Sequence, residues 1–373
     1  MIFLCLAGGC ILVASTLLDA FEVVLLPRPA RRRLRVNRFF FRWSWSVWAW
    51  VARHIQPGRR REDFIGVFGP LSMVSLFGAW ALLLIVGFGL LHWSVQHFSV
   101  GGPLMSMPDA MVVSGDAFFT LGYGDVVPRH ASARLLVIAE AGTGFGYIAL
   151  TIAYLPVLYQ HFSRRDYQLI ELSARAGTPP TADALLQWHA AAGGLASLNQ
   201  WLRDWEIWAS DLTESHSAYP MLAFYRSQHE GHSWLAALAV VLDTCALAIA
   251  GSAGGGPPQA AATFAAARRA LNVVAGSLEI PARAMPPRGG AGDTQAHWAD
   301  AMARLLPDWR DDDASADALA ALRQAYEPVL AGLSFSLLLD LPQWTAADID
   351  GACAPASRAS VVRMLTPRQD AQD

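Results

Sequence analysis

One segment of this chain, residues 120–125, has the residue types and the spacing to coordinate a cation through its backbone. A dehydrated cation needs a column of oxygen ligands, and backbone carbonyls supply one only where successive carbonyls point towards a common axis. Such a backbone needs positive φ at alternate positions, which glycine adopts without a Cβ penalty. The threonine adds a hydroxyl, and the leucine and tyrosine side chains can point outward to brace the strand. The candidate ion-binding residues are Thr120, Leu121, Gly122, Tyr123 and Gly124.

The elements around this segment fit such a use. A candidate pore helix at residues 109–119 precedes it, and two apolar segments flank the pair, an outer helix at 66–93 and an inner helix at 134–162. One copy of the segment faces an ion from one side only. Four copies around a symmetry axis close the coordination shell, so the segment predicts a homotetramer.

The segment resembles the filter of the pore-loop potassium channels, which reads Thr-Val/Ile-Gly-Tyr/Phe-Gly-Asp. The stretch from Asp109 to Thr120 is similar to the bacterial two-helix potassium channels in particular. This resemblance implies an all-α membrane protein, a tetrameric pore-loop channel with a re-entrant pore helix. It implies a potassium-selective ion channel in which K⁺ is the permeant ion. No enzymatic activity, catalytic residue or organic cofactor is expected.

The same resemblance extends the filter to an acidic residue upstream of it. Asp116 lies nine residues before Asp125, at a position that is acidic in some bacterial channels. The resemblance implies that the two carboxyls sit together behind the filter and share a proton, because two close negative charges repel one another. The alternative is that Asp116 only accepts hydrogen bonds from nearby polar groups.

The chain departs from the family pattern at four positions. They are Leu121 in place of Val or Ile, Phe119 in place of Thr, and Val112 and Val113 in place of bulky aromatic residues. These changes keep the carbonyl ligands but alter the bracing of the filter. A weakly selective cation channel is therefore an alternative. A second alternative is a membrane-anchored sensor or interaction protein with a vestigial pore.

Three residues of the inner helix are candidates for a role in gating. Gly144 matches, by its distance from the filter, the hinge position of the two-helix channels; close packing is the alternative role. Pro156 weakens the local hydrogen-bond ladder. Glu140 is an ionisable group at a depth where charge is costly, so we expect it to face water or a partner.

Charge is distributed unevenly along the 373 residues. Residues 1–165 hold 15 Arg against 8 acidic residues, whereas residues 166–373 hold 13 Arg against 23. This asymmetry predicts a membrane unit followed by an acidic, soluble domain. The four cysteines have no metal-ligand spacing.

The predicted organisation has four parts. Residues 1–27 form an N-terminal transmembrane helix; a signal peptide is disfavoured because the basic residues follow the apolar run. Residues 28–63 form a basic linker, residues 64–163 the pore domain, and residues 164–373 a helical domain with a linker near 281–292. Eleven Arg between positions 28 and 61 place the linker, and with it the C-terminal domain, in the cytoplasm of a bacterium with the spans in its inner membrane.

Residues 39–55 of the basic linker carry four Trp together with Arg42 and Arg53. This pattern favours a helix at the membrane surface. A spanning helix there is the alternative, and it would change the parity of the topology. The Arg-rich loop can also bind anionic lipid. Membrane lipid and further copies of the chain are the expected partners, and nucleic acid is not.

The C-terminal half contains predicted helices near 166–176, 181–191, 194–214, 231–250, 258–279, 295–306 and 314–338. Trp201, Trp205 and Trp208 share one helix face, which favours a core or an interface over a ligand site. His216, His229, Glu230 and His232 could bind a metal or sense pH, although their spacing matches no metal motif. We find no dinucleotide fingerprint and no cyclic-nucleotide barrel.

Overall fold

The computed structural model describes residues 1–24, 36–98, 105–128, 130–229, 231–252, 254–285, 288, 294–306 and 308–344. Within these residues the chain forms α-helices and one 3₁₀ helix, and it has no strand beyond an isolated bridge. Three helices are long and apolar enough to cross a membrane: α1 (Ile2–Val24), α3 (Arg59–Phe98) and α5 (Ala131–Ala176). The chain is therefore an all-α membrane protein.

The chain divides into two compact units. Unit 1 comprises Met1–Ile55 and Val67–Gln160, and unit 2 comprises Gln56–Gly66 and His161–Asp373. Besides α1 and parts of α3 and α5, unit 1 contains α2 (Val36–His54) and α4 (Met107–Phe119). Residues 25–35, which hold five of the eleven Arg of the basic linker, lie outside the described residues.

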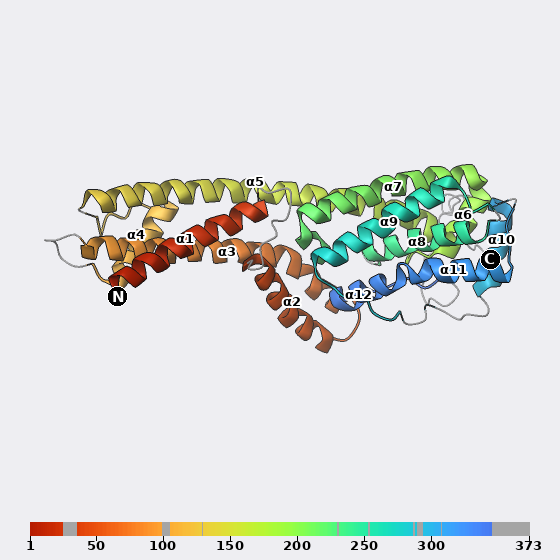
Figure 1. Ribbon diagram of the computed structural model, residues 1–373, viewed down its shortest axis with the longest axis horizontal. Helices are drawn as coiled ribbons and strands as arrows, with labels where there is room; N and C mark the ends of the chain where they lie inside the picture. Colours follow the sequence, from red (N-terminus) through yellow and green to blue (C-terminus); the bar gives the residue numbers. More distant parts are fainter. Residues whose placement is uncertain are drawn as a thin grey trace, which may run out of the picture. The chain divides into compact units, whose positions relative to one another are not determined.

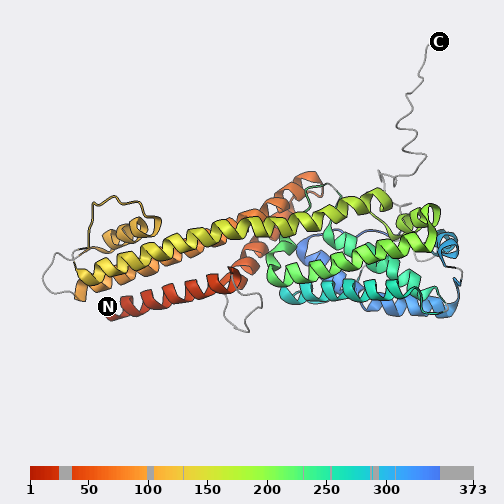
Figure 2. The same ribbon diagram turned by 90° about the horizontal axis from the view of Figure 1, so that it is seen from above.

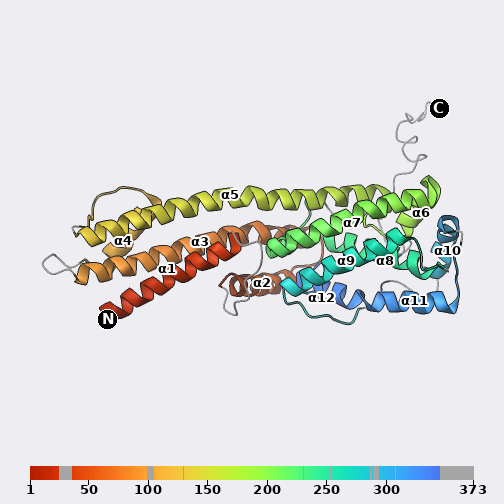
Figure 3. The ribbon, with the colours of Figure 1, turned by 45° about the horizontal axis from the view of Figure 1, so that its top comes forward.

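Helix α1 lies beside α3 in unit 1 (Figures 1 and 3). The two backbones approach closely, because a Cβ on Gly9 would lie 2.8 Å from the Gly87 carbonyl oxygen. Further along the same contact, the indole Nε1 of Trp80 donates a 2.9 Å hydrogen bond to the buried Asp19 carboxylate. A small-residue crossing and one buried polar contact thus join the first span to the outer helix.

Helix α2 packs on α3 through one face and leaves the other face open. Its Trp45 and Trp48 rings lie 4.8 and 5.8 Å from the Phe68 ring. On the opposite side, Trp43 and Trp50 are both more than 60% exposed. This helix is not among the helices apolar enough to cross a membrane. Its location at a membrane surface stays a prediction.

Helices α3 and α5 are both longer than the sequence predicted. Helix α5 continues past residue 162, the predicted end of the inner helix, and through the basic pair Arg164 and Arg165, so the prediction of a separate helix at 166–176 is wrong. Arg165 is 5% exposed and its guanidinium donates to the carbonyls of Leu222 and Tyr225 at 2.9 and 2.8 Å. The basic pair therefore does not end the helix, because one of its members is bonded inside unit 2.

Unit 2 is built around α8 (Trp234–Ala250), whose residues from Trp234 to Ala248 are all buried. Helices α7 (Gly194–Ala218) and α9 (Pro258–Ser277) lie side by side in this unit (Figure 2). The stripe of Trp201, Trp205 and Trp208 is buried, at 3%, 0% and 6% exposure. The prediction that this stripe faces a core is confirmed.

The remaining helices of unit 2 are α6 (Ala182–Ala192), η1 (Pro220–Phe224), α10 (Thr294–Leu305), α11 (Asp313–Gln324) and α12 (Glu327–Leu337). The last two replace the single helix predicted at 314–338 and run nearly end to end (Figures 1 and 3). The break falls before Pro328, which cannot donate the backbone hydrogen bond of a continuous helix. At the break, the Tyr326 hydroxyl donates a 2.6 Å hydrogen bond to Asp243.

Two histidines in the core of unit 2 make its stability depend on pH. Burial lowers the pKa of His216 to about 3, and the charge of Arg165 adds to this effect. Burial, with a contribution from Arg175, lowers the pKa of His189 to about 4. An unfolded histidine titrates near 6.5, so below that pH the unfolded chain binds protons that the folded chain excludes. The contribution of the two neutral histidines to stability is therefore fully present above about pH 6.5, and it is lost as the pH falls.

We therefore expect the free energy of unfolding to fall by about 1.4 kcal/mol per pH unit for each of the two histidines below about pH 6. Thermal unfolding of the full-length protein in detergent, followed by circular dichroism across this range, measures the slope. His216→Leu should reduce the slope, and the matched substitution at the exposed His229 should not. Identical slopes for His216→Leu and the unmodified protein would contradict this account.

Candidate functional site

The pore helix α4 begins and ends with defined capping contacts. Ser106 is its N-cap and accepts a 3.2 Å hydrogen bond from the backbone N–H of Asp109. Pro108 occupies the first turn, where its missing N–H costs nothing. At the other end Thr120 adopts the left-handed conformation (φ 53°, ψ 40°) and stops the helix. The helix starts two residues before the predicted 109–119 and ends where predicted.

The backbone after α4 alternates in the sign of φ. It is positive at Thr120 (53°), Gly122 (74°) and Gly124 (73°), while Leu121 and Tyr123 are not among the positive-φ residues. Alternating right- and left-handed residues turn successive peptide planes the same way, whereas an extended strand turns them alternately. The expectation of positive φ at the two glycines is confirmed. The left-handed Thr120 was not anticipated, because this conformation is uncommon for a β-branched residue.

Asp116 accepts two hydrogen bonds from the backbone of this loop. Its carbonyl oxygen accepts a 2.9 Å hydrogen bond from the N–H of Leu121. Its carboxylate oxygen Oδ1 accepts a 3.0 Å hydrogen bond from the N–H of Tyr123. The carboxylate thus accepts a bond from a nearby polar group, the simpler of its two expected roles. The proton-sharing pair with Asp125 stays a prediction.

The apolar side chains in and just after the loop are exposed to solvent in a single chain. Leu121 is 53% and Tyr123 69% exposed, and Val127 beyond them is 59% exposed. Apolar side chains of this size at an exposed loop are unusual in a monomer and common where another surface covers them.

Gly144 on α5 is the point where the inner helix meets the pore helix. A Cβ built on Gly144 would lie 2.1 Å from the backbone carbonyl oxygen of Phe118. The same construction at Gly142 or Gly146 meets nothing within 4 Å. Of the two expected roles for Gly144, this geometry provides the close packing. A hinge at this position stays a prediction, as does the role of Pro156, which lies inside the continuous α5.

Glu140 is fully buried and joins three helices. Its Oε1 lies 2.5 Å from the Ser114 hydroxyl on α4, and its Oε2 lies 2.7 Å from Nε2 of His92 on α3. Glu140 therefore faces partners rather than water. We call Glu140, Ser114 and His92 the Glu140 triad. Ser114 and His92 were not among the predicted site residues, although each is a polar residue in an apolar segment, and that contrast is visible in the sequence.

An apolar cluster packs the end of the pore helix against the outer helix. Phe118 is fully buried against Leu84, Phe88 and Leu91 of α3. From α5, the Tyr147 hydroxyl donates a 2.6 Å hydrogen bond to the Phe77 carbonyl. The pore helix is thus packed against the outer and inner helices on apolar contacts, with the Glu140 triad as the buried polar link.

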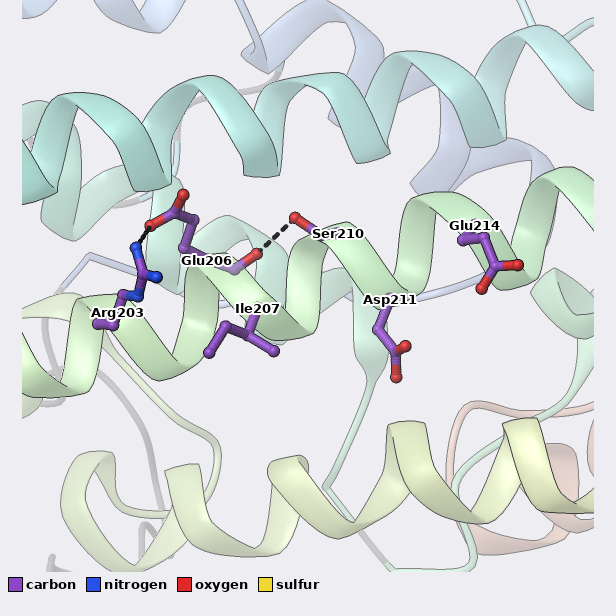
Figure 4. A pocket seen from close by; sticks show the side chains of 6 residues that line it. All are labelled: Arg203, Glu206, Ile207, Ser210, Asp211 and Glu214. Atoms are coloured by element: carbon purple, nitrogen blue, oxygen red, sulfur yellow. Dashed lines mark hydrogen bonds and ion pairs between the residues drawn. The ribbon is translucent and has the colours of Figure 1, made fainter.

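Unit 2 contains no comparable ligand site among its described residues. No group of three or more His, Cys, Asp or Glu residues there could hold a metal ion, and Glu230 lies outside the described residues. A hollow along α7 is lined by residues of that helix alone (Figure 4). In it, Arg203 donates to the Glu206 carboxylate at 3.3 Å, and the Ser210 hydroxyl donates to the Glu206 backbone carbonyl at 2.9 Å. Its neighbour Asp211 pairs with Arg164 at 2.7 Å.

Comparison with known protein families finds one match in the pore region. Residues 77–160 match the family model described as "Ion channel". This range begins in α3 and includes α4, the loop after it, and the part of α5 that carries Glu140 and Gly144. The match supports an ion-channel pore built from these elements.

Among curated proteins, the chain is similar to the uncharacterized membrane protein YdjJ of Bacillus subtilis (strain 168). The two are 27% identical over 203 residues, which cover 52% of this chain and 57% of the relative. The chain thus spans a little over half the length of that relative. No solved structure matches the chain.

The contact between Gly144 and Phe118 makes a specific substitution informative. Gly144→Ala places a methyl group against a backbone oxygen, so α4 or α5 must shift, at a cost of about 1–3 kcal/mol in the free energy of unfolding. Gly142→Ala, two residues away on the same helix, should cost nothing comparable, because its Cβ meets open space. Thermal unfolding of both variants in detergent checks this, and equal midpoints would rule out the close contact.

Proposed function

We propose that four copies of this chain form a potassium-selective channel, in which K⁺ passes through a filter made by the carbonyls of residues 120–124. The permeant ion is the only ligand that the proposal requires. It includes no catalytic residue and no organic cofactor.

The observation that carries the proposal is the backbone of the loop. Positive φ at Thr120, Gly122 and Gly124 alternates with the intervening residues, so successive carbonyls can share one direction. The loop follows a short helix whose last turn supplies Asp116 to the N–H of Tyr123. A carbonyl column held from behind by a hydrogen-bonded carboxylate is suited to replace the hydration shell of a cation.

Symmetry then follows from the geometry of coordination. One loop contributes ligands from one direction, and an ion on an axis needs them from all sides, so a fourfold ring of loops is required. The exposed Leu121 and Tyr123 side chains and the exposed inner-helix residues Leu135, Ile138 and Phe145 offer apolar surface for neighbouring subunits and lipid.

A weakly selective cation channel is the second candidate, and the bracing of the loop favours it. The position of Val112 lacks a bulky aromatic side chain, and Val112 is 55% exposed in the single chain. Val113 is buried in a cluster with Trp93, Met105 and Ala110. A loop supported mainly through Asp116 has fewer contacts to keep its diameter constant, and selectivity depends on that geometry.

We place the channel in a bacterial inner membrane with unit 2 in the cytoplasm, because the Arg-rich linker between α1 and α3 follows the positive-inside rule. The exposed Trp43 and Trp50 of α2 suit the membrane surface, where aromatic rings are enriched. Arg42 and Arg53 lie on the same helix and are exposed, so they offer charge to anionic lipid head groups.

The direct test is ion flux from liposomes that contain the purified full-length protein. We expect K⁺ to leave potassium-loaded liposomes at least about tenfold faster than Na⁺ leaves matched sodium-loaded ones. A tenfold ratio of rates corresponds to a difference of about 1.4 kcal/mol in activation free energy. Gly122→Ala should abolish flux, because φ of 74° strains any residue with a Cβ. Gly115→Ala in α4 is the matched control, since its Cβ meets nothing within 4 Å.

Three results would overturn parts of this proposal. No flux of either ion would reject the channel and favour a membrane-anchored sensor. Equal flux of K⁺ and Na⁺ would reject selectivity and favour the second candidate. Unchanged flux in Gly122→Ala would show that ions do not pass the loop.

A further prediction concerns Asp116. Asp116→Val removes the acceptor of the Tyr123 N–H, and we expect the loop to lose its conducting shape faster during a sustained voltage step. The loss of one hydrogen bond to a charged group corresponds to about a tenfold change in the inactivation rate. Single-channel recording measures the decay, and Asp109→Val, at the opposite end of α4, is the control. A decay that is the same in Asp116→Val as in the unmodified channel, at every pH, would end this account.

A further inference from the structure

The Glu140 triad has a feature that its packing role alone does not explain, which is the number of protons that it can hold. The Ser114 hydroxyl lies within hydrogen-bond distance of two acceptors, Oε1 of Glu140 at 2.5 Å and the carbonyl oxygen of Ile85 at 2.7 Å. A hydroxyl has a single proton and can donate to one of them at a time. Which acceptor it serves depends on whether Glu140 is ionised.

The two states of Glu140 give two arrangements of the same atoms. As a carboxylate, Glu140 accepts hydrogen bonds from Ser114 and from Nε2–H of His92. The Ser114 hydroxyl of α4 then donates to α5. As a neutral acid, Glu140 donates to the Ser114 oxygen, and Ser114 in turn donates to Ile85. One proton on Glu140 therefore reverses the direction of the hydrogen bond between α5 and α4, and it turns the Ser114 proton towards the outer helix α3.

His92 contacts Glu140 through one of its two ring nitrogens, Nε2, at 2.7 Å. Its Nδ1 is buried and has no hydrogen-bond partner among the described residues. A doubly protonated His92 would bury an N–H donor without an acceptor, which is costly. The neutral ring, with its proton on Nε2, can remain in place in both states of Glu140.

Other ionisable groups on the packed elements are engaged elsewhere. On α4, the Asp109 carboxylate accepts from Ser106, and the Asp116 carboxylate accepts from the N–H of Tyr123. On α5, the Arg134 guanidinium donates to the Pro128 carbonyl. On α1, Cys5 packs in the cluster that contains Trp93. Among the described residues, His92 is thus the titratable side chain that contacts Glu140.

The pore helix carries this change a short distance to the loop. Ser114 lies two residues before Asp116, which bonds to the N–H of Tyr123. Gly144, one turn after Glu140, contacts the Phe118 carbonyl near the end of the same helix. The contacts of α5 with α4 thus include one that packing fixes, at Gly144, and one that depends on a proton, at Glu140.

We propose that Ser114 is a positioning residue whose hydroxyl proton switches between Glu140 and the Ile85 carbonyl as Glu140 loses or gains a proton, and that this switch sets the rate of ion flux. The inference deepens the proposed channel function and rests on it. The ionised state holds α4 to α5 through charge-assisted hydrogen bonds, which are stronger than neutral ones, and is the conducting state. Acidification then reduces flux.

The proton itself is observed without any ion flux. Infrared difference spectra of the full-length protein in detergent, recorded across a pH titration, show the carbonyl stretch of a protonated carboxyl group. We expect a band that titrates in the unmodified protein and in Glu171→Gln, a matched control on the same helix, and that is absent in Glu140→Gln. A band that persists unchanged in Glu140→Gln would overturn the assignment of the proton to Glu140.

Flux from liposomes then tests the coupling. We expect K⁺ flux to fall about tenfold as the pH is lowered through the range where the band titrates, the size expected for one charge-assisted hydrogen bond. In Ser114→Ala the infrared band should still titrate while flux no longer follows pH. This variant removes one hydroxyl and serves even where Glu140→Gln does not assemble. Flux in Ser114→Ala that follows pH as in the unmodified channel would overturn the switch.

The failure of the switch and the failure of the channel function have different signatures. A protein that conducts at a rate independent of pH, with a titrating Glu140 band, overturns the coupling and leaves the channel function in place. A protein that conducts no ion at any pH overturns the proposed function, and with it the effect of the switch on flux.

Discussion

The contact between α4 and α5 is the constraint on which the pore unit depends. A helix of 13 residues is marginal by itself, so α4 needs tertiary packing to keep its place. Gly144 supplies that packing by letting the Phe118 carbonyl approach the backbone of α5. The Glu140 triad adds a polar link one turn away. The positive-φ loop can then start from a helix end whose position is determined on two sides.

Glu140 can be buried because each of its two carboxylate oxygens has a hydrogen-bond partner nearby. An unpaired carboxylate in an apolar bundle would cost several kcal/mol, and the cost falls when donors are close enough to satisfy it. Here the donors come from two other helices, so the polar contact also fixes the relative register of α3, α4 and α5. Apolar contacts alone would leave that register less specific, because they lack direction.

Local signals were sufficient for the loop and its helix. The glycines at 122 and 124 predicted positive φ, and the predicted pore helix at 109–119 is close to the observed helix, Met107–Phe119. The partners of Glu140 were not predictable in the same way, because 26 and 48 residues separate them from it in the chain. Only the fold brings Ser114 and His92 together.

The error at the end of α5 has a different physical cause. An Arg pair after an apolar run usually stays in water at a membrane boundary, and Arg164 and Arg165 follow directly after the predicted inner helix. Arg164 fits such a position, because its side chain is 69% exposed and pairs with Asp211, which is 31% exposed. Arg165 instead lies in the core of unit 2, where its guanidinium donates hydrogen bonds to two backbone carbonyls of the segment from 220 to 228. Charge in the sequence does not show which of two adjacent side chains a neighbouring segment will bond.

The segment from 220 to 228 also satisfies the carbonyls at the end of α12. The last carbonyls of a helix have no partners within it, and a cation placed there is favourable. Arg226 donates to the carbonyls of Leu337 and Leu338 at the end of α12, at 2.6 and 2.8 Å, and lies 3.8 Å from Glu62 at the start of α3. Asp166 of α5 accepts from Ser227 in the same segment at 2.7 Å. The start of α3 and the last turns of α5 are therefore bonded to one short segment, and a displacement of that segment would act on both helices.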